Sequence, residues 1–288
     1  MKKKVLLKRS IGVALFLLAA AVSAFDWPQQ VVPDSFYSYF GQLRGGTLSS
    51  SLIFSEPGTV KSAETGRVLI VMTEHNGDYG WFESTLGNAV VLEHRDDLLT
   101  VYGNLGSIDK DLTRKTIDSG AVLGETGNSG WQQGKSCLEF QVLDAKSGTA
   151  INPRTVMPRI GREPGLKIDG ITAVDASGRS FSIPGPRPLA AGKYRLYKNR
   201  QKTAVPFATT VSLNGAAVEE LTYDILVRKD NRLCLMGRKP YSVQDMYPDA
   251  EKQLLGNILL PHGRDILSVT VKDILGTETT VSYTVPVN

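Results

Sequence analysis

The chain contains few of the side chains that bind metals or form disulfides. Among its 288 residues are three histidines, His75, His94 and His262, and two cysteines, Cys137 and Cys234. Two cysteines allow one disulfide at most, and the sequence leaves open whether they approach each other. Because a stable zinc site needs three or four protein ligands, three scattered histidines provide little material for one.

A long hydrophobic run is also absent. The longest apolar stretch, residues 11–21, has about eleven residues, too few to cross a bilayer as a folded anchor. It follows a basic segment and precedes the small residues 22–24. We predict a signal peptide over residues 1–24, with an uncleaved anchor as the alternative. The mature protein is then exported to the periplasm or outer cell envelope and has no stable membrane anchor.

An excess of either charge is absent once this signal is removed. The full sequence has 33 Lys and Arg against 29 Asp and Glu, and five of the basic residues lie within residues 1–24. The mature chain therefore has 28 basic and 29 acidic residues, a formal net charge of about −1. Nothing in this balance indicates binding to nucleic acid or to a membrane surface.

Sustained helical periodicity is nearly absent. Short runs rich in β-branched residues alternate with Gly, Asn and Asp turns, which is typical of antiparallel strands. The sequence therefore predicts an all-β protein. Strands are expected at residues 67–72, 88–94, 98–104, 121–124, 137–143, 166–174, 192–198, 208–213, 221–228, 266–273 and 279–285, and one short helix at 248–255.

Proline and glycine concentrate near the middle of the chain. Residues 152–165 contain three prolines and two glycines, a composition that suits a stiff, exposed linker. The strand pattern that follows is typical of an immunoglobulin-like β-sandwich. We predict a lead-in segment at 25–42, a first domain at 43–158, a linker at 159–165 and a β-sandwich domain at 166–288.

Six motifs in the first domain share the order and spacing of one protein family. They are residues 58–68 (GTVKSAETGRV), 87–94 (GNAVVLEH), 99–105 (LTVYGNL), 119–130 (SGAVLGETGNSG), 137–142 (CLEFQV) and 150–153 (AINP). The block resembles the M23 (LytM, lysostaphin-type) peptidase family. The resemblance implies an antiparallel β-sheet fold in an exported protein that acts on the cell wall.

The resemblance also implies a zinc site that this chain does not complete. In the family, a His and an Asp four residues apart and the second His of a His-x-His pair bind zinc, while two further histidines handle protons. We therefore expect no catalytic residue, no bound metal and no cofactor. The matching positions hold Thr47 or Leu48 for the first His, Ser51 or Leu52 for the Asp, Asn104 for one proton-handling His, and Cys137 and Glu139 for the pair.

Three interpretations of Cys137 and Glu139 remain open at this point. The two residues could contribute to a rebuilt metal site, although further ligands are missing. Cys137 could be a nucleophile with His94 as its base. In the simplest interpretation, Cys137 is a small buried hydrophobe and Glu139 is a polar residue at a groove.

Two functional hypotheses follow from the resemblance. The first is an exported, catalytically inactive M23-like protein that binds peptidoglycan or regulates a cell-wall hydrolase, either of which would be its partner. The alternative is a divergent zinc metalloendopeptidase that cleaves peptidoglycan peptide bridges. Under the first hypothesis, the vacated groove would bind a peptide or protein through a mainly aromatic set of side chains. That set is Trp81, Phe82, Tyr102, Asn104, Trp131 and Gln132.

Overall fold

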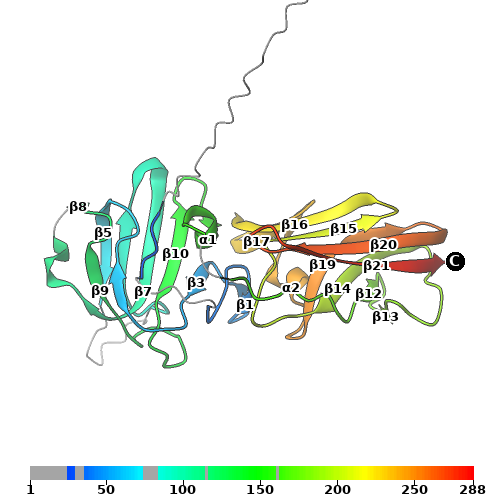
Figure 1. Cartoon of the computed structure of the whole chain (residues 1–288), viewed down its shortest axis with the longest axis horizontal. Helices are drawn as coiled ribbons and strands as arrows, with labels where there is room; N and C mark the ends of the chain where they lie inside the picture. The colour runs from blue at the N-terminus through cyan, green and yellow to red at the C-terminus, as the bar shows by residue number, and fades with distance from the viewer. Residues whose placement is uncertain (1–24, 30–35, 74–83, 114–115, 160–161) are drawn as a thin grey trace, which may run out of the picture.

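Antiparallel strands make up nearly all the regular structure of the computed structural model, which describes residues 25–29, 36–73, 84–113, 116–159 and 162–288. Within these ranges there are two one-turn α-helices, α1 (Pro153–Val156) and α2 (Val243–Met246). The predicted all-β class is confirmed. Figure 1 shows two β-rich halves side by side along the long axis, with the C-terminus at the far end of the second half. The predicted signal peptide and residues Trp81 and Phe82 lie outside the described residues.

Strand β10 (Glu139–Asp144) lies at the centre of the first half. One edge of β10 pairs with β7 (Leu98–Ile108), and the other edge is shared by β3 (Ser51–Ile53) at its start and β11 (Thr149–Ile151) at its end. From β7 the sheet continues outward through β6 and β5 to β8, while β9 joins β7 to β4 and a separate hairpin is formed by β1 and β2. The bounds are β1 (Leu43–Arg44), β2 (Thr47–Leu48), β4 (Thr59–Lys61), β5 (Gly66–Met72), β6 (Asn88–Glu93), β8 (Thr116–Ile117) and β9 (Val122–Thr126).

The register of these strands places large apolar side chains on one face. Tyr102 of β7 lies opposite both Phe140 of β10 and Val90 of β6. These three residues are completely buried, together with Leu92 and Leu52. Each buried side chain of this size stabilises the fold by about 1.5–3 kcal/mol. This core holds the start of β10 in a fixed position.

The second half is a sandwich of two antiparallel sheets, as the sequence predicted. One sheet has the order β21-β20-β15-β16, with β17 and β18 beyond β16, and the other has the order β13-β12-β14-β19. Leu196, Leu255, Val211, Leu267 and Val269 are completely buried in the core of this half. The bounds are β12 (Thr172–Asp175), β13 (Ser180–Ser182), β14 (Gly192–Asn199), β15 (Ala208–Leu213), β16 (Ala216–Lys229), β17 (Arg232–Met236), β18 (Pro240–Tyr241), β19 (Lys252–Leu260), β20 (Gly263–Lys272) and β21 (Glu278–Val287).

The prediction of a helix at residues 248–255 is wrong. Helix α2 ends at Met246, and β19 begins at Lys252. Leu254 and Leu255 are both buried but belong to different hydrophobic clusters. Successive side chains point to opposite sides in a strand, so the extended backbone lets the adjacent Leu254 and Leu255 reach the two clusters. Packing on both faces therefore overrides the local signals for a helix.

The two halves are joined by a continuous sheet and a shared hydrophobic cluster. Ala150 of β11 pairs with Leu226 of β16, so one sheet runs from the first half into the second. The shared cluster contains Phe40 and Leu48 from the first half and Tyr223 from β16. The predicted linker at 159–165 thus connects halves that also pack directly against each other.

The lead-in segment contributes to this junction. The Tyr247 hydroxyl donates to the Gly41 carbonyl at 2.9 Å, and Gln42 Nε2 donates to the Lys202 carbonyl at 2.9 Å. Gly41 has φ +79°, and a Cβ there would lie 2.7 Å from the Tyr223 ring. Residues 41–48 are therefore fixed to the second half just before the chain enters the first-half sheet.

Candidate functional site

Glu139, at the position of the family's last zinc ligand, is a buried and fully hydrogen-bonded carboxylate. It is the first residue of β10, and its side chain is only 7% exposed. Oε1 accepts from Ser51 Oγ at 2.8 Å and from Gln141 Nε2 at 3.2 Å. Oε2 accepts from Arg44 Nη1 at 3.2 Å and from Gln132 Nε2. Both carboxylate oxygens are thus committed to groups of the chain itself.

Arg44 provides the positive charge at this position. It closes the β1–β2 hairpin, whose turn is formed by Gly45 and Gly46 at φ +56° and +78°. Besides Glu139, its guanidinium donates to the Trp131 carbonyl at 3.1 Å and to Gln132 Oε1. Gln132 is completely buried and bonds to both partners of the ion pair. Arg44, Gln132 and Glu139 thus hydrogen-bond to one another, and the Arg44 guanidinium balances the buried charge of the Glu139 carboxylate.

The structure decides between Ser51 and Leu52, the two residues that could match the zinc-binding aspartate of the family. Ser51 Oγ lies beside Glu139 and 3.2 Å from Ser49 Oγ, whereas Leu52 is in the core of the first half. For the histidine position, Thr47 is exposed and Leu48 is buried in the shared cluster. The polar side chain that lies at the site is therefore Ser51.

Asn104 fixes the loop that precedes β10. Its backbone has φ +63°, and its side-chain amide donates to the carbonyls of Gly127 and Cys137, both at 2.7 Å, and of Lys135 at 3.0 Å. The amide oxygen accepts from Gly130 N at 2.8 Å. Asn104 is completely buried, so both ends of its amide are used within the chain.

Cys137 is a buried thiol whose described contacts are the Asn104 amide and the Lys135 carbonyl, neither of which is a base for a thiol. Burial raises its pKa, and the nearby Glu139 carboxylate raises it further. His94, the base considered from the sequence, has its ring nitrogens 3.0 Å from the Thr65 carbonyl and 2.7 Å from Thr100 Oγ1. Both ring nitrogens of His94 thus have partners other than Cys137, so the structure gives no support to His94 as the base of a nucleophilic Cys137. Cys137 and Cys234 are both free.

The predicted groove residues do not form a single surface. Tyr102 is completely buried, and its hydroxyl accepts from Ala63 N at 2.8 Å. Asn104 and Gln132 are buried and hydrogen-bonded, as described above. Trp131 is 64% exposed. Of the four described members of this set, only Trp131 is available to a partner.

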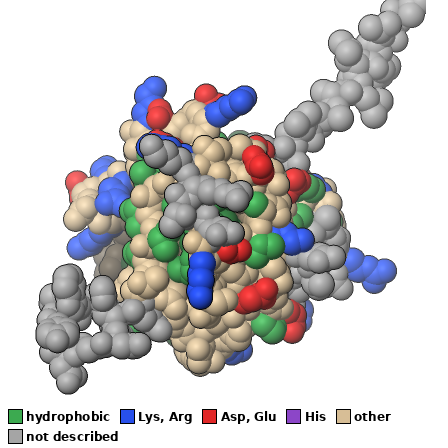
Figure 2. All heavy atoms as spheres, turned by 90° about the vertical axis from the view of Figure 1, so that its left-hand side faces the viewer, with side chains coloured by type: hydrophobic (Ala, Val, Ile, Leu, Met, Phe, Trp, Pro, Cys, Tyr) green, Lys and Arg blue, Asp and Glu red, His purple; other side chains and the backbone are tan. Residues whose placement is uncertain are grey.

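The end of the first half that faces away from the second half also has exposed hydrophobic side chains. Leu69, Ile70 and Val71 on β5 are between 44% and 47% exposed. Figure 2 shows this end, where small groups of hydrophobic side chains lie between basic and acidic ones. Nothing in the described ranges shows what would cover them.

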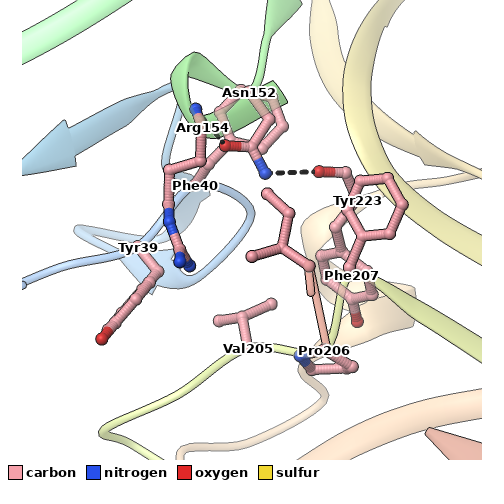
Figure 3. A pocket seen from close by; sticks show the side chains of 9 residues that line it. Tyr39, Phe40, Asn152, Arg154, Val205, Pro206, Phe207 and Tyr223 are labelled. Carbon is pink, nitrogen blue, oxygen red and sulfur yellow. Dashed lines mark hydrogen bonds between the residues drawn. The ribbon is translucent and has the colours of Figure 1, made fainter. Parts of the chain in front are cut away.

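A small cavity lies at the junction of the halves, separate from Glu139. Its volume is about 10 Å³, close to the minimum for one water molecule. Figure 3 shows its lining, including the hydrogen bond from Asn152 Nδ2 to the Tyr223 carbonyl, 2.8 Å long. It has no room for a larger ligand.

A zinc ion does not fit the residues at the family's metal position. Glu139 is the only carboxylate bonded there, and the cation beside it is Arg44. Within the described ranges, no group of three or more His, Cys, Asp or Glu side chains could hold a metal ion. A catalytic zinc requires about three protein ligands, so the donor set is insufficient.

The sequence did not identify Arg44 and Gln132 as partners of Glu139. The Gly45-Gly46 pair does signal a tight hairpin turn, and Arg44 directly precedes it. The two glycines predict the hairpin, but they do not predict that the hairpin lies against the start of β10.

Comparison with known proteins places this domain in a family. The model of peptidase family M23 matches residues 50–153, and a second family model without a description matches residues 165–288. An uncharacterized protein of Treponema pallidum (strain Nichols) is 35% identical over 139 residues, which cover 43% of this chain and 92% of that protein.

Several solved structures are similar to this chain at low sequence identity. A catalytic-domain mutant of the prophage-encoded M23 protein EnpA from Enterococcus faecalis has 22% identity and a TM-score of 0.34, covering 41% of this chain and 88% of that one. Csd3 from Helicobacter pylori has 17% identity and a TM-score of 0.36, covering 49% and 37%. A chain of the SpoIIQ–SpoIIIAH pore-forming complex has 19% identity and a TM-score of 0.35, covering 48% and 92%.

The fold and the residues around Glu139 define an M23-type domain whose described residues do not include the family's metal-binding set. The chain is a degenerate member of peptidase family M23. No helix in the described part of the chain is long and apolar enough to span a membrane.

Proposed function

We propose that this protein is a catalytically inactive M23-like module of the cell envelope that binds peptidoglycan or regulates a cell-wall hydrolase. The proposal rests on one observation, the set of hydrogen bonds that the Glu139 carboxylate accepts. Its carboxylate is saturated by Arg44, Gln132, Ser51 and Gln141. A metal would have to displace the Arg44 guanidinium and then find two further ligands.

The family match supports a role at the cell wall, and the segment at 1–24 supports export. Peptidases of this family act on peptidoglycan, so a member without the metal set retains the fold as a binding module. Trp131 is an exposed aromatic side chain whose backbone carbonyl accepts from Arg44, next to the former centre. We assign it a place on the binding surface, because exposed aromatic rings are common anchors for partners.

The proposal is tested on purified residues 25–288. The protein is dialysed with zinc and then against a weak chelator, and its metal content is measured. It is also incubated with insoluble peptidoglycan, with release of soluble fragments and co-sedimentation recorded. We expect substoichiometric zinc, no release, and protein in the pellet or a changed rate of an added hydrolase.

The divergent zinc metalloendopeptidase is the competing outcome of this test. Near-equimolar zinc that disappears in Glu139→Gln and Cys137→Ala, together with release of fragments, would establish it and overturn the proposal. Glu139→His alone should not create activity, because Ser51 and Asn104 still occupy two other family positions and Arg44 still lies beside residue 139.

A further inference from the structure

The last strand of the chain, β21, has an open edge. It pairs with β20 on one side, and β20 continues the sheet toward β15 and β16. On its other side, the described part of the chain pairs with it only near the C-terminus, where Leu189 N donates to the Pro286 carbonyl at 3.0 Å. Figure 1 shows β21 in dark red at the end of the molecule away from the first half. No described strand therefore covers its edge from Glu278 to Val285.

The even-numbered residues of β21 direct their backbone groups to this edge. In an antiparallel pair, every second residue bonds to the neighbouring strand, and the residues between them bond outward. Asp273 N donates to the Thr277 carbonyl at the start of the β20–β21 pair, which then runs without a register shift. Thr280, Ser282 and Thr284 consequently direct their N–H and C=O groups away from β20. These groups are available to a further strand.

The edge also lacks the features that usually prevent such pairing. Natural edge strands are protected by charged side chains, by proline or by a β-bulge. Strand β21 carries one charged side chain, Glu278 at its first position, and its pairing with β20 contains no bulge. Pro286 lies beyond the open part, where Leu189 already bonds. The open part is thus a regular template for strand addition.

The side chains along this edge are symmetric in type about Ser282. Val281 and Thr280 precede it, and Tyr283 and Thr284 follow it. The three hydroxyl-bearing residues are exposed, whereas the valine and the tyrosine are half-buried against the core of the second half. A partner strand with the same alternation places hydroxyls beside hydroxyls and apolar side chains beside apolar ones. A second β21, running in the opposite direction, has this alternation.

We propose that β21 pairs with β21 of a second copy of this chain, antiparallel and about a two-fold axis at Ser282. In this register Ser282 lies opposite its own copy, and Thr280 lies opposite Thr284 of the second copy. Val281 lies opposite Tyr283, and aromatic and β-branched side chains form favourable pairs across strands. Because a two-fold interface closes on itself, the expected assembly is a dimer and not a filament.

The outer face of the sheet fits this pairing. Ser268 and Ser282 have their Oγ atoms 2.8 Å apart, and the Oγ1 atoms of Thr270 and Thr280 are also 2.8 Å apart. In the dimer these rows of hydroxyls continue onto the second copy. The two Glu278 carboxylates lie at opposite ends of the joined edge, so no like charges meet there. Since one sheet already runs from β21 to β8, the dimer joins two copies into a single sheet.

The dimer is tested by analytical ultracentrifugation of purified residues 25–288 over a range of concentrations. We expect a reversible monomer–dimer equilibrium. Ser282→Pro removes an outward N–H without breaking the bonds to β20, and Ser282→Lys places two like charges at the axis. Both should raise the dimer dissociation constant by about tenfold or more. Ser282→Thr, which keeps the hydroxyl and the N–H, is the matched control and should leave the constant unchanged.

Cross-linking tests the register. Residues that exchange hydrogen bonds across an antiparallel pair have Cα atoms about 5.5 Å apart, within the range of a disulfide. Ser282→Cys should therefore form a disulfide-linked dimer on mild oxidation. Ser268→Cys should not, because three strand spacings, about 14 Å, separate the two copies of residue 268. The parent is the baseline, since Cys137 and Cys234 are buried.

Three outcomes would overturn the proposal. A parent that remains monomeric at every concentration would exclude a second copy as the partner and leave the edge to a strand of another protein. A dimer that persists unchanged in Ser282→Pro and Ser282→Lys would place the contact on another surface. Cross-linking of Ser268→Cys as readily as of Ser282→Cys would contradict the register. None of these outcomes depends on peptidoglycan binding or on metal content.

Discussion

Arg44 Nη1 lies 3.2 Å from Glu139 Oε2, and this contact connects two structural units. Arg44 belongs to the hairpin that follows the lead-in segment, which is bonded to the second half through Gly41 and Gln42. Glu139 begins the central strand of the first half. The former metal position therefore serves as an attachment point between the hairpin and the sheet.

Removal of Arg44 should destabilise the protein. In Arg44→Met the Glu139 carboxylate remains buried without a counter-charge, and we expect the free energy of unfolding to fall by about 2–4 kcal/mol. Arg44→Met/Glu139→Gln should lose less than the sum of the two single variants. Urea unfolding measures all three.

The control for this experiment is Arg67→Met, which breaks an exposed ion pair. Arg67 and Glu93 have side chains that are 60% and 35% exposed. The expected loss is below about 1 kcal/mol. Equal losses in Arg44→Met and Arg67→Met would contradict the assignment of a buried, structural pair.

Asn104 can be tested by separating its amide bonds from its backbone conformation. Asn104→Gly removes the amide but tolerates φ +63°, and we expect a loss of about 2–4 kcal/mol from carbonyls left without donors. Asn104→Ala should lose about 1 kcal/mol more because it also strains the backbone. Thermal unfolding gives both values. A glycine variant as stable as the parent would show that the amide bonds contribute nothing.

The junction is tested by two glycines with positive φ. Gly41→Ala places a Cβ 2.7 Å from the Tyr223 ring, whereas Gly45→Ala meets nothing within 4 Å. We expect Gly41→Ala to cost about 2–4 kcal/mol and Gly45→Ala about 1 kcal/mol. Calorimetry provides the measurement. If the first substitution is no more harmful than the second, residues 41–48 are not packed against the second half as described.

Lys198 should make stability depend on alkaline pH. Burial lowers its pKa to about 8, partly offset by Asp169, from the ordinary value of 10.5. Between about pH 8 and 10.5 the unfolded state therefore binds more protons at Lys198 than the folded state does. Below about pH 8 the charged Lys198 lowers the free energy of unfolding by its full amount, and this loss disappears as the pH rises to about 10.5.

Lys198→Met should accordingly stabilise the protein by about 1–3 kcal/mol at pH 7, with a gain that shrinks above pH 8. Chemical denaturation at pH 7 and pH 10 measures the difference. Lys193→Met, at an exposed position on the same strand, is the control. A gain that is constant with pH would mean that Lys198 is not desolvated.

The sequence predicted the all-β class and the M23-like block because strand runs, glycine turns and motif spacing are local features. It also identified Asn104, Cys137 and Glu139 as altered positions. It could not identify Arg44 and Gln132 as partners of Glu139, since they lie 95 and 7 residues away in the chain. The helix expected at 248–255 failed for a related reason, because Leu254 and Leu255 serve two clusters that only the tertiary structure defines.

The arginine at the former centre also bears on how such a domain could change during evolution. A histidine introduced alone at position 139 meets a guanidinium and leaves Gln132 without its acceptor. Removal of Arg44 alone leaves a buried carboxylate. Each single substitution toward the family's metal site is expected to lower stability before a ligand set is complete, so the Arg44–Glu139 pair opposes a stepwise rebuilding of that site.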